Sequence, residues 1–140
     1  MDRRAFLATA GAAALSPVAG CLDGGLSEPE YDVGMSANAF LPDSHEVAVG
    51  ETVVWGNNGS RKHTVTAYES AIPDGAAFFA SGGFETTTAA REAWKEAGAG
   101  NIAPGETFAH TFETPGSYGY LCIPHEPKGM VGVVEVLERE

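Results

Sequence analysis

The chain has 140 residues, 44% of them hydrophobic, and carries a formal net charge of −11. This length allows one domain with a real core and is too short for two ordinary domains. Phosphate backbones and anionic lipid head groups would repel so acidic a chain, which excludes nucleic acid as a partner and a basic patch as the means of membrane attachment.

The first twenty residues predict an export signal. Arg3 and Arg4 precede an apolar, small-residue run over residues 5–15, which is too short for a permanent membrane span. The adjacent arginines resemble a twin-arginine signal, which exports proteins that are already folded. We therefore assign residues 1–20 to the signal and leave them out of the fold.

Cys21 follows Val-Ala-Gly, a pattern that resembles a lipobox, in which the cysteine is lipidated and begins the mature protein. This pattern predicts an exported lipoprotein, anchored to the outer face of the cytoplasmic membrane. The alternative is a disulfide between Cys21 and Cys122, the only other cysteine. Residues 21–30 are rich in Gly, Ser, Pro and acidic residues, which predicts a flexible tether ahead of a domain over 31–140.

Short stretches rich in Val, Thr, Tyr and Phe follow the tether, with the length and composition of β-strands. Turn signals such as Asn-Asn-Gly-Ser over 57–60 and Pro-Gly-Ser over 115–117 separate them. The predicted strands cover residues 31–35, 45–49, 52–55, 63–68, 107–112, 117–121 and 131–137. Strands of this length and spacing predict an all-β fold, a β-sandwich.

Residues 86–97 differ from the strands because they are rich in Ala, Glu, Lys and Arg. Threonines can cap the start of this stretch and Gly98 can end it, so we expect one short surface helix. Residues 70–83 surround the apolar pair Phe78 and Phe79 with Pro and Gly, and we interpret them as a packed excursion between strands.

Three groups capable of binding a metal stand close together near the C-terminus: Cys122, His125 and Met130. Blue-copper sites use two histidines and one cysteine in a trigonal plane with a weak axial methionine. The second histidine must come from elsewhere, and His63 follows the turn after a predicted strand. Each of these residues is common in ordinary cores, and only the combination indicates copper. A thiolate ligand at Cys122 also argues against the disulfide.

The motif Cys-x-x-His-x-x-x-x-Met after a Tyr-Gly-Tyr strand, with an upstream histidine after Val-Val-Trp-Gly-Asn-Asn, resembles the plastocyanin-type cupredoxins and, among them, the halocyanins. The resemblance covers about residues 31–137. It implies a Greek-key sandwich holding one type 1 copper ion through His63, Cys122, His125 and Met130. It also implies that the outer edge of His125 is the electron port, opening through an apolar patch that includes Pro124.

The resemblance implies a monomeric carrier of single electrons between membrane-associated redox partner proteins, a donor and an acceptor, and not an enzyme. We expect the backbone N–H of Thr64 to be the chief hydrogen-bond donor to the Cys122 sulfur, because Pro124 has none. A copper enzyme would need further histidines, and only His45 and His110 remain, for which we expect surface and half-buried packing roles. Copper storage or delivery outside the cytoplasm is the alternative, although the chain has few other cysteines or methionines.

Overall fold

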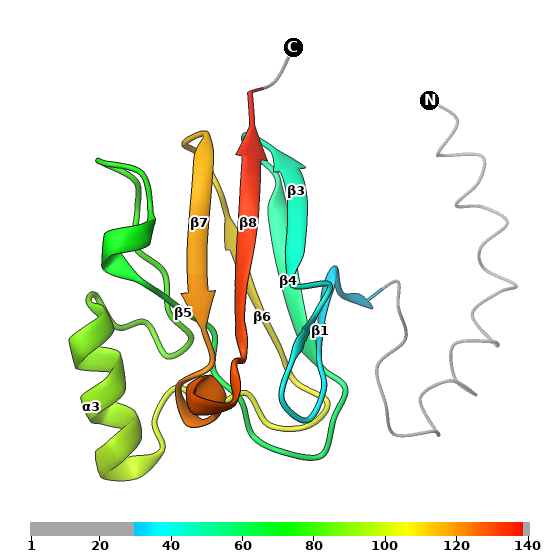
Figure 1. The fold of residues 1–140 in the computed structure, drawn as a ribbon, viewed down its shortest axis with the longest axis vertical. Helices are drawn as coiled ribbons and strands as arrows, with labels where there is room; N and C mark the ends of the chain where they lie inside the picture. Colours follow the sequence, from blue (N-terminus) through cyan, green and yellow to red (C-terminus); the bar gives the residue numbers. More distant parts are fainter. Residues whose placement is uncertain (1–29, 139–140) are drawn as a thin grey trace, which may run out of the picture.

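The computed structural model describes residues 30–138, which form two four-stranded sheets (Figure 1). The sheet orders are β2-β1-β4-β6 and β3-β8-β7-β5. The strands are β1 (Val33–Met35), β2 (Phe40–Leu41), β3 (Ser44–Ala48), β4 (Thr52–Asn57), β5 (Thr66–Ala67), β6 (Thr107–Thr111), β7 (Gly116–Leu121) and β8 (Val131–Leu137). The chain crosses repeatedly from one sheet to the other, so β1 pairs with β4 and β3 with β8 in parallel, while the remaining pairs are antiparallel. The predicted β-sandwich is confirmed.

The core lies between the two sheets and is built from the side chains that alternate inward along each strand. Trp55 of β4 is fully buried, and its ring contacts Phe79, Phe108, Phe112 and Tyr120. In β8 the alternate residues Val134 and Val136 are buried against the same core. Burial of each large apolar side chain contributes about 1.5–3 kcal/mol, so this aromatic centre holds the sheets in register.

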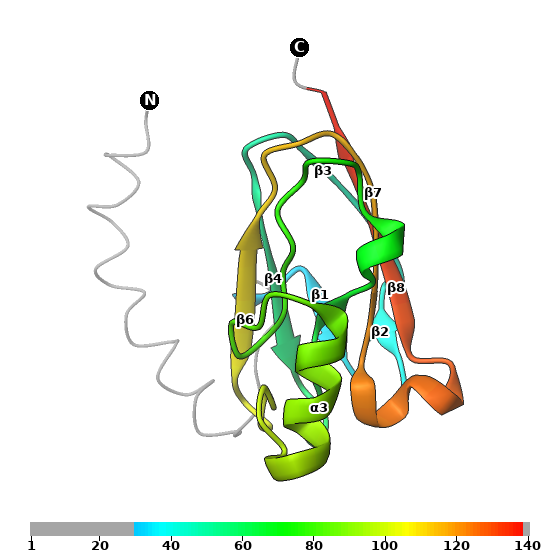
Figure 2. The same cartoon turned by 90° about the vertical axis from the view of Figure 1, so that its left-hand side faces the viewer.

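The predicted helix forms as α3 (Thr87–Ala97). The Thr86 side chain accepts a hydrogen bond from the Ala89 N–H at its start, and Gly98 ends it in the left-handed conformation. Two short 3-10 helices, η2 (Glu69–Ala71) and η3 (Ile123–Lys128), complete the elements. Figures 1 and 2 both show α3 at the end of the sandwich where η3 joins β7 to β8.

Some strand predictions differ from the structure. The strand expected over 63–68 shortens to β5, and His63 lies before it in an isolated bridge with Ile102. The two-residue strand β2 was not predicted, because so short a strand leaves no periodic signal in the sequence. Residues 70–83 form the expected excursion, in which Phe79 is buried in the core.

The predicted signal, the tether up to residue 29 and Cys21 lie outside the described residues. The domain boundaries therefore stay predictions. Within residues 30–138, no helix is long and apolar enough to cross a membrane.

Candidate metal centre

Three of the four predicted ligands meet at one end of the sandwich. His63 is held by paired backbone hydrogen bonds with Ile102, of 3.2 Å from its own N–H and 2.7 Å to its carbonyl. Cys122 follows directly after β7, and His125 lies in the next turn, in η3. Cys122 and His63 are fully buried, and His125 is 8% exposed. The site thus has one slightly open side, at the imidazole of His125.

The ligand atoms face one another at distances that fit a metal ion. The Sγ of Cys122 lies 3.5 Å from the Nδ1 of His63 and 3.4 Å from the Nδ1 of His125. Two atoms bound to one ion at about 2.0–2.3 Å, in a trigonal plane, lie about 3.5–3.8 Å apart. Taking one ligand atom from each of the three residues, all three atoms lie within 4.8 Å of one another. One thiolate and two imidazoles are the equatorial ligands that copper prefers, so the residues present fit this ion.

Met130 closes the loop that carries Cys122 and His125. Its carbonyl accepts a 3.0 Å hydrogen bond from the Cys122 N–H, and its own N–H donates to the His125 carbonyl at 3.3 Å. Gly129, at a φ of 88°, makes the sharp turn that brings Met130 back toward the site. The methionine is fully buried. The backbone of Met130 is thus bonded to Cys122 and His125, two of the other predicted ligands. Ligation of copper through the thioether of Met130 stays a prediction.

Burial prepares both imidazoles to bind a cation. Burial, followed by the charge of His125, lowers the pKa of His63 to about 4. Burial, followed by the positive charges of Arg61 and Lys128, lowers the pKa of His125. Both rings are therefore neutral at pH 7, with ring nitrogens available. Burial raises the pKa of the Cys122 thiol, and a bound metal ion overcomes this effect because it deprotonates a coordinating thiol.

The Nε2 of His63 meets no acceptor at hydrogen-bonding geometry among the described residues, although the backbone of Ser36 is close enough to raise the pKa of the ring. A buried ring nitrogen without a firm partner is uncommon. The imidazole is therefore positioned chiefly by packing and by its backbone bridge, with Nδ1 toward the Cys122 sulfur.

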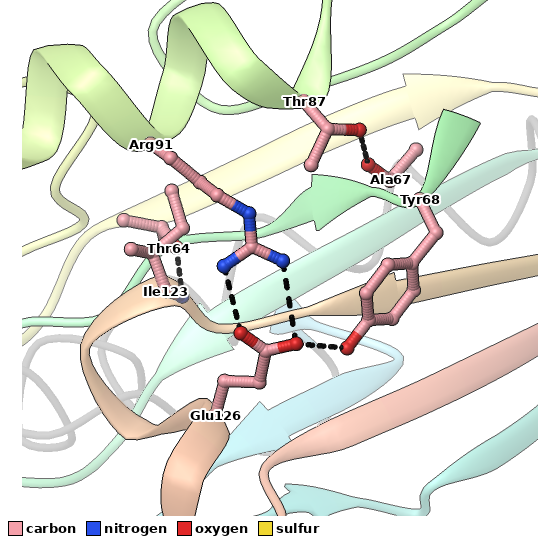
Figure 3. Close-up of polar contacts among 7 residues, drawn as sticks. All are labelled: Thr64, Ala67, Tyr68, Thr87, Arg91, Ile123 and Glu126. Carbon is pink, nitrogen blue, oxygen red and sulfur yellow. Dashed lines mark hydrogen bonds and ion pairs between the residues drawn. The ribbon is translucent and has the colours of Figure 1, made fainter. Parts of the chain in front are cut away.

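Thr64 contacts the ligand loop through both its backbone and its side chain. Its N–H donates to the Cys122 sulfur at 3.4 Å, which confirms the expected contact. Its hydroxyl oxygen accepts a 2.8 Å hydrogen bond from the Ile123 N–H, as Figure 3 shows. Hydrogen bonds to a ligating sulfur tune the electronic properties of a copper site. The hydroxyl contact was not predicted, because no motif places a threonine opposite residue 123.

Helix α3 is bound to the ligand loop by a charged clamp made of Arg91, Glu126 and Tyr68 (Figure 3). Arg91 reaches the two carboxylate oxygens of Glu126 at 2.7 and 3.3 Å, and the Tyr68 hydroxyl donates to the same carboxylate. Arg91 thereby holds the pKa of the Glu126 carboxyl below its usual value, while burial, followed by Glu126, raises the pKa of Tyr68 to about 12. No sequence motif indicates this clamp, because Tyr68, Arg91 and Glu126 are far apart in the chain.

The start of the helix is fixed to the second sheet as well. The Thr87 hydroxyl donates to the Ala67 carbonyl at 2.8 Å (Figure 3). The Glu69 N–H in turn donates to the Thr87 hydroxyl at 3.1 Å. Because Ala67 belongs to β5, which pairs with β7 just before Cys122, the helix and the ligand loop rest on the same strands.

The two remaining histidines lie away from this centre. His45 is partly exposed in β3, and half-buried His110 stacks on Phe79 at 4.7 Å. Trp55 is in the core, and Trp94 lines a shallow groove beside Ile123 between α3 and the ligand loop. Among residues 30–138, the three-residue cluster of His63, Cys122 and His125 is the one group of metal-binding side chains found together. Cys122 forms no disulfide there.

A two-sheet sandwich with a buried Cys-His-His cluster at one end defines a cupredoxin-like copper protein. The family model of copper binding proteins of the plastocyanin/azurin family matches residues 28–137. This chain therefore belongs to the plastocyanin/azurin family, and its cofactor is copper.

Three comparisons illustrate the likeness. Chloroplastic plastocyanin of Hordeum vulgare is 35% identical over 131 residues, which are 91% of this chain and 76% of that protein. A mutant plastocyanin of fern, solved in oxidized and reduced forms, superposes with a TM-score of 0.51 at 26% identity, over 74% of this chain and 97% of that one. A Cu-containing nitrite reductase of Thermus scotoductus SA-01 superposes with a TM-score of 0.53 at 23% identity, over 77% of this chain but 22% of that one, and shares the fold alone.

Proposed function

We propose that this protein carries single electrons on one type 1 copper ion held by His63, Cys122, His125 and Met130. The observation that supports this most strongly is the convergence of one sulfur and two Nδ1 atoms at 3.4–3.5 Å, in a chain of the plastocyanin/azurin family. When bound, copper accepts and returns one electron by alternating between its divalent and monovalent states.

The protein residues supply a fixed environment for that exchange. Cys122 would supply a thiolate ligand and, through its covalency, a path for the electron into β7. His63 and His125 would supply imidazole nitrogens, and the thioether of Met130 would favour the reduced ion. The backbone bridge at His63, the Met130–Cys122 hydrogen bond and the Arg91–Glu126 clamp all restrain the ligands. Little rearrangement is then needed between oxidation states.

Burial of the ligands favours a carrier over the other functions. An enzyme needs a coordination position open to substrate, and storage or delivery needs ligands that exchange readily. Here His63, Cys122 and Met130 are fully buried, and His125, at 8% exposure, is the one ligand residue that reaches the surface. An electron can leave by way of His125, whereas a substrate or a copper acceptor protein has no direct access to the ion.

The cellular setting belongs to the same proposal and rests on the sequence. The lipobox-like residues before Cys21 support a lipid anchor on the outer face of the cytoplasmic membrane, with residues 21–30 as a tether. A monomer held in this way, of the halocyanin type, would move between membrane-associated electron donors and acceptors.

Reversible reduction of the loaded protein tests this function. The full-length protein is loaded with Cu(II), reduced with ascorbate and reoxidised with ferricyanide, and its visible spectrum is recorded at each step. We expect an intense blue band that disappears and returns over repeated cycles with no loss of copper. Loss of copper on each reduction would instead support storage or delivery.

A further inference from the structure

The positive charges of this acidic protein are unevenly placed. The Lys and Arg residues of the described chain are Arg61, Lys62, Arg91, Lys95 and Lys128. Every one of them lies in the loop that ends at His63, in α3 or in η3, all at the copper end of the molecule (Figures 1 and 2). The same segments carry three carboxylates, Glu92, Glu96 and Glu126, so their local balance is about two positive charges, against −11 for the whole chain.

Arg61, Lys62 and Lys128 flank the two histidine ligands directly. Arg61 and Lys62 immediately precede His63, and Lys128 lies three residues after His125 in the same short helix. After burial, the positive charges of Arg61 and Lys128 are the next causes that lower the pKa of His125, in keeping with their places beside this residue. We call these three residues the cationic collar.

The members of the collar are exposed, and within residues 30–138 none of them forms an ion pair with a carboxylate. Of the cations within residues 30–138, Arg91 is the one that forms an ion pair, with Glu126. The same ion pair neutralises the charge of Glu126, which is the acidic residue closest to His125 in the sequence. Glu106, also near this end, accepts a hydrogen bond from the Ala103 N–H through its carboxylate. The collar thus presents free positive charge to solvent.

The loop that carries Arg61 and Lys62 is held in place by a buried asparagine. Asn57, 1% exposed, donates from its side-chain amide to the carbonyls of Arg61 and Ile102, both at 2.7 Å, and accepts from the Gly59 N–H at 3.0 Å. A fixed backbone keeps these charges beside His63, so that they act together with Lys128 on the η3 side.

The opposite end of the sandwich is acidic. Glu113 lies between β6 and β7, at the end of β7 remote from Cys122, and Glu138 follows β8 at the same end (Figure 1). Both are exposed. The molecule is therefore electrically asymmetric along its length. At an ionic strength of about 0.1 M the Debye length is roughly 10 Å, so an approaching charge senses mainly the nearer end, whereas at about 0.01 M it is roughly 30 Å and the charge of both ends is felt.

We propose that the cationic collar docks an acidic surface patch on the redox partner protein and so directs that partner to the surface beside His125. This inference deepens the proposed electron-carrier function and rests on it. Complementary charge raises the rate of encounter and fixes orientation, and it falls away with salt. The partner recognised at the copper end would thus carry the same sign of charge as this protein as a whole.

Small oxidants of opposite charge test the collar. Copper-loaded, reduced full-length protein is mixed with ferricyanide, of charge −3, or with tris(phenanthroline)cobalt(III), of charge +3. Each oxidant accepts one electron from one monovalent copper ion, and return of the blue band gives the bimolecular rate constant. We expect the ferricyanide rate constant to fall about threefold or more as the ionic strength rises from roughly 100 to 500 mM, a range in which the Debye length is about 10 Å or less and the local charge decides the rate.

Charge-reversal variants separate the local field from the net charge. At an ionic strength of roughly 100 mM, Lys128→Glu should slow the reaction with ferricyanide about three- to tenfold and speed the reaction with the cobalt complex. Glu113→Lys, at the far end, should change neither rate by more than about twofold. The double variant has the net charge of the wild type and should behave like Lys128→Glu. Lys62→Glu should act in the same direction as Lys128→Glu.

Two results would overturn the docking proposal while leaving the carrier function intact. One is a ferricyanide rate that rises with salt in the wild type, and the other is a double variant that reacts like the wild type. Absence of reaction with both oxidants would contradict the carrier function itself. A variant whose copper site was disturbed would lose its blue band or react more slowly with both oxidants. In that case the rate constants of Lys62→Glu, which changes a collar residue in another loop, test the proposal instead.

Discussion

Thr64 and Thr66 are near neighbours and both are buried, but their hydroxyl groups differ. The Thr64 hydroxyl accepts from the Ile123 N–H, whereas the Thr66 hydroxyl has no hydrogen-bond partner among the described residues. Replacement by valine keeps the shape and removes only the hydroxyl. Removal of one partner from a buried hydrogen bond leaves the other unsatisfied, while removal of an unsatisfied group relieves a cost.

We therefore expect Thr64→Val to lower the free energy of unfolding by about 1–3 kcal/mol. Thr66→Val, the matched control, should be neutral or stabilising. Urea unfolding of both variants, loaded with copper, measures the difference. Equal losses in the two variants would show that the Thr64 hydroxyl does not hold the ligand loop.

Met130 is the ligand whose replacement should change the reduction potential and leave the blue colour. Met130→Gln offers an oxygen in place of sulfur, and an oxygen donor favours the harder, oxidised ion. We expect the potential to fall by roughly 60 mV or more, which corresponds to about a tenfold change in the redox equilibrium. Voltammetry measures the shift, and an unchanged potential would show that Met130 is not an axial ligand.

His110 should make the stability of the fold depend on pH. Burial lowers its pKa in the folded protein, so protonation favours the unfolded chain. The stabilisation from the neutral ring is fully present above the pKa of the unfolded state, about 6.5, and is lost as the pH falls below it. His110→Phe should therefore lose less stability than the wild type between about pH 7 and 5. Parallel urea titrations at both pH values decide this, and identical losses would contradict it.

At the scale of elements, the main feature is the attachment of α3 to the ligand loop. Arg91 and Glu126 are 40% and 29% exposed, so solvent weakens their attraction, and the two-point geometry strengthens it. We expect Arg91→Met to cost about 1 kcal/mol of stability and to speed copper loss to a chelator. Lys95→Met, on the same helix but without an ion pair in the described part of the chain, is the control. Equal rates of copper loss in both variants would assign the clamp no role at the site.

The sequence predicted those elements whose signals are local. Helix α3 has a capping threonine and a terminal glycine, and the long strands have β-rich composition between Gly and Pro turns. Cys122, His125 and Met130 share one loop, so their spacing alone indicated a metal. Strand β2, the Thr64–Ile123 contact and the Arg91–Glu126–Tyr68 clamp could not be predicted, because each depends on segments that only the tertiary fold brings together.

At the scale of the whole molecule, the sandwich separates two tasks. The aromatic core around Trp55 and Phe79 fixes the two sheets, and the loops at one end carry the ligands. The composition indicates an acidic protein, and the Lys and Arg residues within 30–138 all lie in the segments at the copper end of the sandwich. Net charge is a sum over the sequence, so it cannot reveal this asymmetry, which only the arrangement of the loops produces.

The most direct test of the account is the visible spectrum of the full-length protein with Cu(II), recorded for the wild type and for Cys122→Ser. Only a thiolate bound to copper gives the intense blue band that this site predicts. We expect the band in the wild type, its disappearance with ascorbate, and its absence in Cys122→Ser at any copper concentration. A colourless wild type, or a serine variant as blue as the wild type, would contradict the claim that Cys122 and the two histidines hold a type 1 copper ion.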